Sequence, residues 1–167
     1  MTNKQSSGSS IVILLFIFCA VGAGLMVWGG IVLRNASVSK EWPLAQGEIV
    51  TSYVNISIDE DGTTYSADIA FRYVVNDRWL TADTVNFGEY GSSNRNHAAD
   101  IVAKYPVGKV VNVYYDPAKP ETAVLEPGVT WSSYIILFMG LLFIIMPLIT
   151  FVAVLKSNSR VVVNYLL

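Results

Sequence analysis

The side chains best suited to chemistry are few in this sequence and widely separated. His97 is the single histidine, and no other side chain accompanies it at metal-ligand spacing, whereas structural zinc takes four ligands, usually Cys and His. The acidic run 59–61 precedes Gly62, but the alternating oxygen ligands and the later glutamate of a calcium loop are missing. We therefore expect a solvated histidine, an acidic hairpin turn, no metal site and no cofactor.

Catalytic motifs are also missing. Ser92 and Ser93 follow Gly91, yet no Gly-x-Ser-x-Gly elbow occurs, and a single histidine without a partner makes no triad. No phosphate-binding Gly-Lys-Ser/Thr loop is present. The sequence thus favours a protein that is not an enzyme.

Aromatic residues are abundant in the middle of the chain, and most are expected in its core. Trp79 and Tyr90 fall near expected loops, where they could form an exposed patch for a partner. The alternative is that they too are core or membrane-interface aromatics.

Two long apolar segments bracket the chain. Residues 11–33 and 131–155 contain no charged side chain, and about 20 apolar residues suffice to span the roughly 30 Å hydrocarbon core of a bilayer. We expect both to be transmembrane helices, with a flexible tail at 1–10, an extramembrane domain at 34–130 and a C-terminal tail at 156–167. A cleaved signal peptide is the alternative for the first segment, but its apolar run exceeds the 7–15 residues typical of signals.

Small residues on the two segments predict contact between the helices. Ala20 and Gly24 lie four residues apart on the first, and Gly140 and Pro147 lie seven apart on the second. Small faces allow helix backbones to approach closely in lipid, so these four residues are the expected packing positions. Pro147 is also expected to kink its helix.

The middle segment has the composition of one small acidic domain. It holds all 13 acidic residues and eight basic ones, a net charge of −5, which argues against nucleic acid as a partner. Alternation with a period of two predicts strands at 47–58, 65–75 and 79–87, joined by turns at 59–62 and 76–77. In the first of these, the even-numbered set from Val50 to Ile58 is more apolar and is expected to face the core.

A short helix and two further strands complete the expected domain. Ser93 or Asn94 can cap a helix that reaches Lys104, and strands are expected at 109–115 and 122–125. The predicted fold class is therefore an α+β membrane protein, in which two transmembrane helices bracket a small, mainly antiparallel β domain with one short helix.

The positive-inside rule barely decides the orientation. The tails carry Lys4, Lys156 and Arg160, and three basic residues flank the spans on the domain side. The free N-terminal amine and the close pair after the second span favour tails in the cytoplasm and a β domain on the extracytoplasmic side. Membrane lipid is then one partner, and other membrane subunits or a second copy are expected as well.

Three ordered motifs carry a family resemblance. They are Trp-Pro-Leu-Ala-Gln-Gly-Glu-Ile at 42–49, Tyr-Pro-Val-Gly-Lys-Val-Val-Asn-Val-Tyr-Tyr-Asp-Pro at 105–117, and Pro-Glu-Thr-Ala-Val-Leu at 120–125. Together they resemble a widespread bacterial family of two-helix membrane proteins known only as a domain of unknown function. The resemblance implies this architecture and a place in the plasma membrane, and it supplies no activity or site residue. The functional hypothesis is an accessory or scaffold subunit of a membrane assembly; the alternative is an envelope-facing sensor or protective module that captures a ligand or toxin.

Overall fold

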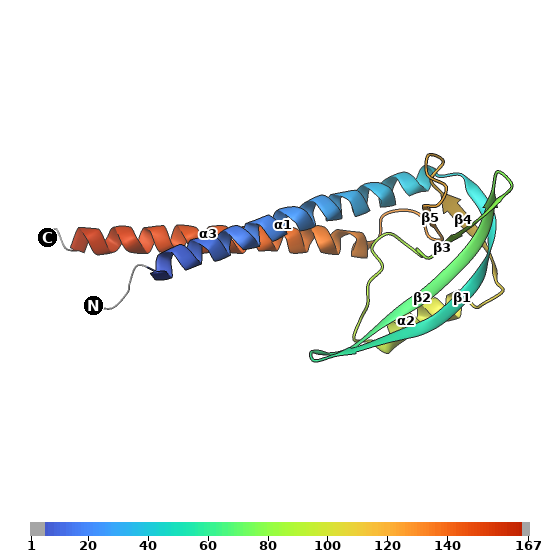
Figure 1. The fold of residues 1–167 in the computed structure, drawn as a ribbon, viewed down its shortest axis with the longest axis horizontal. Coiled ribbons are helices and arrows are strands. Elements are labelled where there is room, and N and C mark those ends of the chain that lie inside the picture. The colour runs from blue at the N-terminus through green and yellow to red at the C-terminus, as the bar shows by residue number, and fades with distance from the viewer. Residues whose placement is uncertain (1–5, 165–167) are drawn as a thin grey trace. The chain divides into compact units, whose positions relative to one another are not determined.

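The computed structural model describes residues 6–164, which form two compact units. The helical unit combines the chain up to Ile31 with the chain from Tyr134 onward, and the β unit spans Val32–Ser133. The fold is α+β, with a five-stranded antiparallel sheet and with long apolar helices near both ends of the sequence (Figure 1). Both helices hold a segment long and apolar enough to cross a membrane, at Val12–Glu41 and Trp131–Ala153.

The helices extend beyond the expected boundaries. Helix α1 begins at Ser6, inside the expected tail, of which residues 1–5 lie outside the described part. Helix α3 runs through Pro147 to Asn164, so the expected tail 156–167 is helical up to that residue, and 165–167 lie outside the described part. The elements in order are α1 (Ser6–Val38), η1 (Ser39–Glu41), β1 (Leu44–Asp59), β2 (Gly62–Val75), β3 (Arg78–Ala82), α2 (Arg95–Lys104), β4 (Val110–Tyr115), β5 (Ala123–Val124), η2 (Trp131–Tyr134) and α3 (Ile135–Asn164).

The sheet has the strand order β3-β2-β1-β4-β5 and is built around the long β1–β2 hairpin. The β2–β3 connection is the tight turn expected from the sequence: Asn76 and Asp77 both have positive φ, at 51° and 59°, as a two-residue hairpin turn requires. The Asp116 side chain accepts a hydrogen bond from the backbone N–H of Ala118 at 2.8 Å, which fixes the turn after β4.

A bulge in β1 changes which of its residues face the core. Pairing with β2 runs from Gly47↔Tyr73 to Ile49↔Phe71 and then shifts to Thr51↔Ala70, so Val50 is an extra residue. A single inserted residue moves every later side chain to the other face. The expectation that the even-numbered set faces the core is therefore wrong before the bulge, where Ile49 is 1% exposed and Val50 is 39% exposed. Past the bulge it holds at Ser52 and Val54, which are half-buried, and it is wrong at Ile56 and Ile58, which are 52% and 79% exposed.

The core of the β unit lies between the sheet, helix α2 and the segment that follows β3. Helix α2 is capped by Asn94, whose side chain accepts from the backbone N–H of Asn96 at 3.0 Å. It covers the sheet with Ala98 and, just past its end, Tyr105, both of which are buried. The buried cluster is formed by Ile49, Ile69, Phe71, Tyr73, Val75, Val85, Tyr105, Val111, Val113, Ala123 and Leu125.

The third strand is shorter than expected, because its residues leave the sheet after Ala82. Thr84 and Val85 instead accept backbone hydrogen bonds from Leu125 and Glu126, at 3.3 and 2.8 Å. Val85 thereby enters the core at 1% exposure. Beyond β3, the rest of the expected strand 79–87 is therefore an irregular segment, which lies beside the residues that come directly after β5.

The two ends of the β unit are joined through one buried hydroxyl. The Ser39 side chain is fully buried, donates to the carbonyl of Ala36 at 2.9 Å and accepts from the N–H of Gly128 at 2.9 Å. A buried backbone donor needs such a partner, so Ser39 fixes the chain entering the β unit to the chain leaving it.

Candidate functional site

Glycines of α1 and α3 lie where these two helices approach each other closely. A Cβ on Gly22 would lie 3.0 Å from the carbonyl oxygen of Gly140, and a Cβ on Gly140 would lie 2.8 Å from the backbone nitrogen of Met26. Gly29 is equally close to the backbone of Leu137, at 2.9 Å. The two helices therefore pack backbone to backbone, as small residues permit in lipid.

Of the four expected packing residues, Gly140 lies in this contact and Pro147 is buried on α3. Ala20 is exposed, and nothing lies within 4 Å of a Cβ built on Gly24. An α-helix turns by about 100° per residue, so both lie roughly 160° around the helix from Gly22. The α1 stripe chosen from the sequence is thus on the wrong side, and the contacting residues, Gly22 and Gly29, are seven apart.

An apolar groove of about 200 Å³ lies between the same two helices. Cys19 and Phe16 contribute from α1, and Pro147 and Phe151 contribute from α3. No ionisable side chain other than the Cys19 thiol lines it, so it suits hydrocarbon rather than a polar ligand.

A polar concave surface of the β unit surrounds the irregular segment after β3. Two neighbouring cavities, of about 380 and 340 Å³, share Asp83 and Thr84 in their walls. Glu121 lines the first and Glu89 the second, and no basic residue lines either. The segment is held in place by the bonds of Thr84 and Val85 described above, and by a hydrogen bond from the Ser133 hydroxyl to the Phe87 carbonyl.

Glu89 is the electrostatically perturbed group of this surface. Burial, together with the charges of Glu126 and Asp83, raises the pKa of its carboxyl to about 7, and a hydrogen bond from the Val85 backbone N–H opposes this rise. One of its carboxyl oxygens and the side-chain oxygen of Asn86 are buried without a hydrogen-bond donor among the described residues. Two buried acceptors without a donor favour the protonated form of Glu89, which can itself donate.

The neighbouring Glu126 is satisfied instead. Its Oε1 accepts from Lys104 Nζ at 2.6 Å and from the Tyr105 hydroxyl at 2.7 Å. Burial opposes ionisation, but these two hydrogen bonds and the lysine charge lower the pKa of Glu126 overall. The same carboxylate, together with burial, raises the pKa of Tyr105. Glu126 is therefore a structural anion that ties the end of α2 to the segment after β5.

The chemistry open to this surface is limited. An acidic concavity without basic residues repels anions and suits cations or N–H donors. Among the residues that the structure describes, no group of three or more His, Cys, Asp or Glu side chains is placed to hold a metal ion. His97, the one histidine, stacks on the ring of Tyr90 with centroids 4.9 Å apart.

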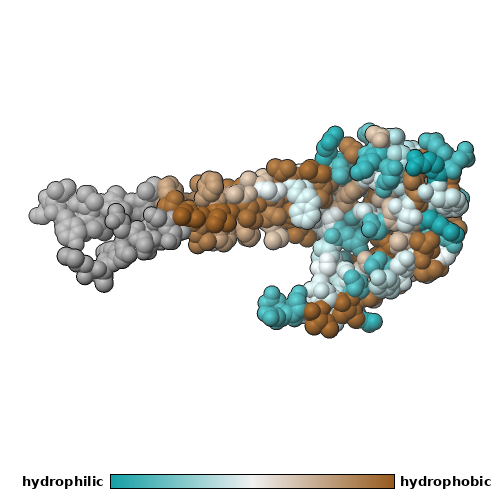
Figure 2. Space-filling model, in the orientation of Figure 1, coloured by the Kyte–Doolittle hydropathy of each residue, from teal (hydrophilic) through white to brown (hydrophobic). Residues whose placement is uncertain are grey.

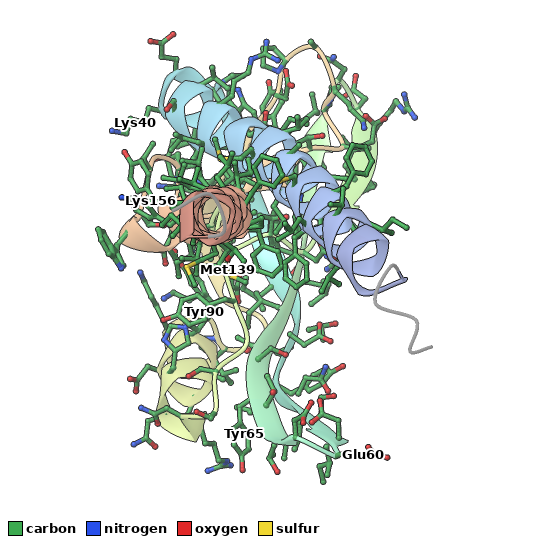
Figure 3. The ribbon with its side chains drawn as sticks, turned by 90° about the vertical axis from the view of Figure 1, so that its left-hand side faces the viewer. Lys40, Glu60, Tyr65, Tyr90, Met139 and Lys156 are labelled. Atoms are coloured by element: carbon green, nitrogen blue, oxygen red, sulfur yellow. The ribbon has the colours of Figure 1, made fainter. Side chains whose placement is uncertain are left out.

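Trp79 and Tyr90, the expected partner patch, are both exposed, at 68% and 47%. The Arg72 guanidinium lies over the Trp79 ring at 5.3 Å from its centroid, whereas Tyr90 lies beside α2 (Figure 3). The contacts within the described chain thus place the two aromatics on different elements, and a shared patch stays a prediction. Sequence reasoning missed Asp83, Asn86 and Glu89, since the first two fell in a segment taken for a strand and the third in an unremarked loop.

The fold defines a class of protein: a small antiparallel β unit that is bracketed in the sequence by two long apolar helices. The model of the family described as Domain of unknown function (DUF3592) matches residues 45–130, more than half of the chain. This chain belongs to that family. No curated protein and no solved structure matches it.

Proposed function

We propose that this chain is a non-enzymatic integral membrane protein that serves as an accessory or scaffold subunit of a larger membrane assembly. In this proposal α1 and α3 cross the bilayer as a packed pair, and the β unit stands on the extracytoplasmic side of a plasma membrane. The positive charges of Lys156 and Arg160 after the second span support that orientation.

The observation that carries the proposal is the exterior of the helical unit. Large apolar side chains cover it, including Phe16 at 74%, Val27 at 67% and Ile149 at 60% exposure (Figure 2). Soluble monomers rarely expose contiguous apolar surface of this extent, whereas lipid tails solvate it without cost. The glycine contacts between α1 and α3 fit the same environment, since close backbone packing replaces the hydrophobic drive there.

An assembly role is supported by the absence of charge in the predicted membrane-spanning segments. The intramembrane surface carries no acidic or basic side chain between Val12 and Leu33, and such side chains usually mark ion or proton paths. Two uncharged helices therefore suit anchoring and association better than transport.

The test has two stages. First, the full-length protein should resist alkaline carbonate extraction from membranes and require detergent to stay in solution; release into the aqueous phase would refute the membrane placement. Second, the protein extracted into native nanodiscs should carry stoichiometric partner chains or further copies of itself by native mass spectrometry. A clean monomer in several mild extraction media would refute the scaffold role.

A second candidate function is a binding module that captures a ligand or toxin with its β unit. The two cavities that share Asp83 favour it, because they are concave and carboxyl groups are the only acidic or basic side chains in their described walls. A thermal-shift titration of the detergent-solubilised protein with Ca²⁺, Mg²⁺ and spermidine tests it. A shift that disappears in the Asp83→Asn/Glu89→Gln variant supports the module, and a shift that survives the double substitution, or no shift with any probe, refutes a cation-binding role.

A further inference from the structure

The second half of β1 has an edge with no neighbouring strand among residues 6–164. Its pairing with β4 ends at Ile49, which exchanges backbone hydrogen bonds with Lys109 and Gly108 at 3.0 and 2.9 Å. From Thr51 to Asp59, β1 pairs with β2 on one side, and within the described part of the chain no strand pairs with its other side. Figure 1 shows β1 and β2 leaving the sheet together as a two-stranded ribbon.

The pairing register tells which backbone groups point out of this edge. Asp59 and Gly62 flank a two-residue turn as partners, and the groups of an antiparallel strand alternate between its two sides. The odd-numbered residues of β1 beyond the bulge therefore bond to β2. Tyr65, in the outward set of β2, agrees, since it exchanges two 2.8 Å bonds with Ser92. The outward groups of β1 belong to Ser52, Val54, Ile56 and Ile58.

Beyond the bulge at Val50, this edge lacks two of the features that protect exposed strands, namely charged side chains and proline. Proteins usually blunt an edge with charged residues, proline or a short strand, but 51–58 contains no charged residue and no proline. Two of the outward residues also expose their side chains, Ile56 at 52% and Ile58 at 79%. Such an edge is a template for another strand.

We propose that the open edge of β1 pairs antiparallel with the same edge of a second copy of this chain. The midpoint of the open edge is Asn55, so the two copies of Asn55 lie opposite each other as a pair that is not hydrogen-bonded. Val54 then bonds to Ile56 of the partner copy, and Ser52 to its Ile58. This register uses all four outward residues of each copy and forms roughly eight backbone hydrogen bonds.

The neighbouring elements select this register. Outward groups can meet only if the strands shift by steps of two residues. A shift toward β4 would place Asp59 of the partner copy opposite Ile49, whose outward backbone groups already bond to Gly108 and Lys109, and the opposite shift leaves outward groups unpaired. In the central register the two sheets join into one continuous sheet.

Charge complementarity favours a second copy as the occupant. The hairpin tip carries three acids at 59–61, with Glu60 at its end (Figure 3). In the paired copies each acidic tip reaches Lys109 of the other, whose Nζ donates to the Lys104 carbonyl at 2.6 Å and has no carboxylate partner among the described residues. The uncharged segment between brings no like charges together.

The inference deepens the proposed function, on which it rests for the shared membrane that concentrates the two copies. A symmetric disulfide tests it. Non-hydrogen-bonded antiparallel pairs have Cα atoms about 4.5 Å apart, within disulfide range. In a Cys19→Ser background, Asn55→Cys in full-length protein in native membranes should give a reducible covalent dimer under mild oxidation.

Ser57→Cys is the matched control, equally exposed on the same hairpin. Its two copies would lie four residues out of register, about 13 Å apart, so it should stay monomeric. Co-expressed Tyr53→Cys and Ser57→Cys copies should cross-link, since these positions oppose each other in the proposed register. Adding Ile56→Lys to Asn55→Cys should abolish the dimer by placing a charge on the edge.

The pairing is refuted if Asn55→Cys stays monomeric, or if Ser57→Cys cross-links as readily. The native mass spectrum separates this failure from that of the proposed function. If other membrane proteins still accompany an Asn55→Cys variant that stays monomeric, the proposed pairing is refuted and the scaffold role is supported. A solitary monomer would sink both.

Discussion

Replacing Gly140 with alanine should weaken the helix pair, whereas the same change at Gly24 should not. A Cβ at position 140 would lie 2.8 Å from the backbone nitrogen of Met26 and 3.0 Å from the carbonyl oxygen of Gly22. Both obstacles are backbone atoms, so relief requires the helices to separate. At Gly24 nothing lies within 4 Å of the added methyl group.

The expected magnitude follows from two opposing effects. Overpacking of this kind costs about 1–3 kcal/mol, and the better helix propensity of alanine returns up to about 1 kcal/mol. Gly140→Ala should therefore lose about 1–2 kcal/mol, which corresponds to a fall in Tm of roughly 2–8 °C for a chain of this size. Gly24→Ala should leave Tm unchanged or raise it by a few degrees.

Thermal unfolding of the full-length protein in one detergent, followed by tryptophan fluorescence, measures both variants under identical conditions. Equal losses in the two variants would mean that the α1–α3 contact does not run through Gly140. A larger loss at Gly24 would instead restore the stripe of Ala20 and Gly24 as the packing face.

Two further predictions concern the β unit. Ser39→Ala removes the acceptor of the buried Gly128 N–H and should cost about 1–3 kcal/mol of stability, measured as a lower Tm. Ser37→Ala, at an exposed position, should change the Tm little. Equal Tm values for the two variants would contradict the role of the Ser39–Gly128 hydrogen bond. Because folding raises the pKa of Glu89 from about 4.5 to about 7, chiefly through burial, the folded protein keeps a proton that the unfolded chain releases in this range. The stability from this protonated carboxyl is thus complete below pH 4.5 and is lost as the pH rises to about 7. Glu89→Gln should flatten the fall of Tm with rising pH. Glu60→Gln, at the exposed hairpin turn, should leave that fall unchanged. Parallel Tm–pH profiles for wild type and Glu89→Gln would contradict the burial of the Glu89 carboxyl.

Local chemistry was sufficient to predict most elements. Asn76-Asp77 tolerates the positive φ that a two-residue hairpin needs, and Asn94 has the side chain that caps α2. The long uncharged runs predicted both apolar helices, because length and hydropathy are properties of the chain alone. The C-terminal ends of both helices were predicted too early, and the start of the first helix was predicted too late. Helix boundaries depend on residues that propensity barely distinguishes.

Other features follow from partners distant in sequence. The bulge at Val50 reverses the faces of β1, and it lies where the pairing with β4 has ended while the pairing with β2 continues. Val85 lies outside β3, and its carbonyl accepts a hydrogen bond from the backbone N–H of Glu126. The same segment carries Glu89 into a buried, acidic surrounding that residues near it in the sequence do not predict.

Sequence alone determined that this protein has two apolar helices and an antiparallel β unit between them, because periodicity and apolar length act over a few residues. Only the tertiary structure decided that Gly22 and Gly29, rather than Ala20 and Gly24, meet α3, and that no strand of residues 6–164 pairs with the outer edge of β1 beyond Ile49. In a uniformly apolar helix the sequence does not distinguish one face from another, and the sequence of a strand does not show which neighbouring strand ends first. Both features are therefore set by tertiary packing.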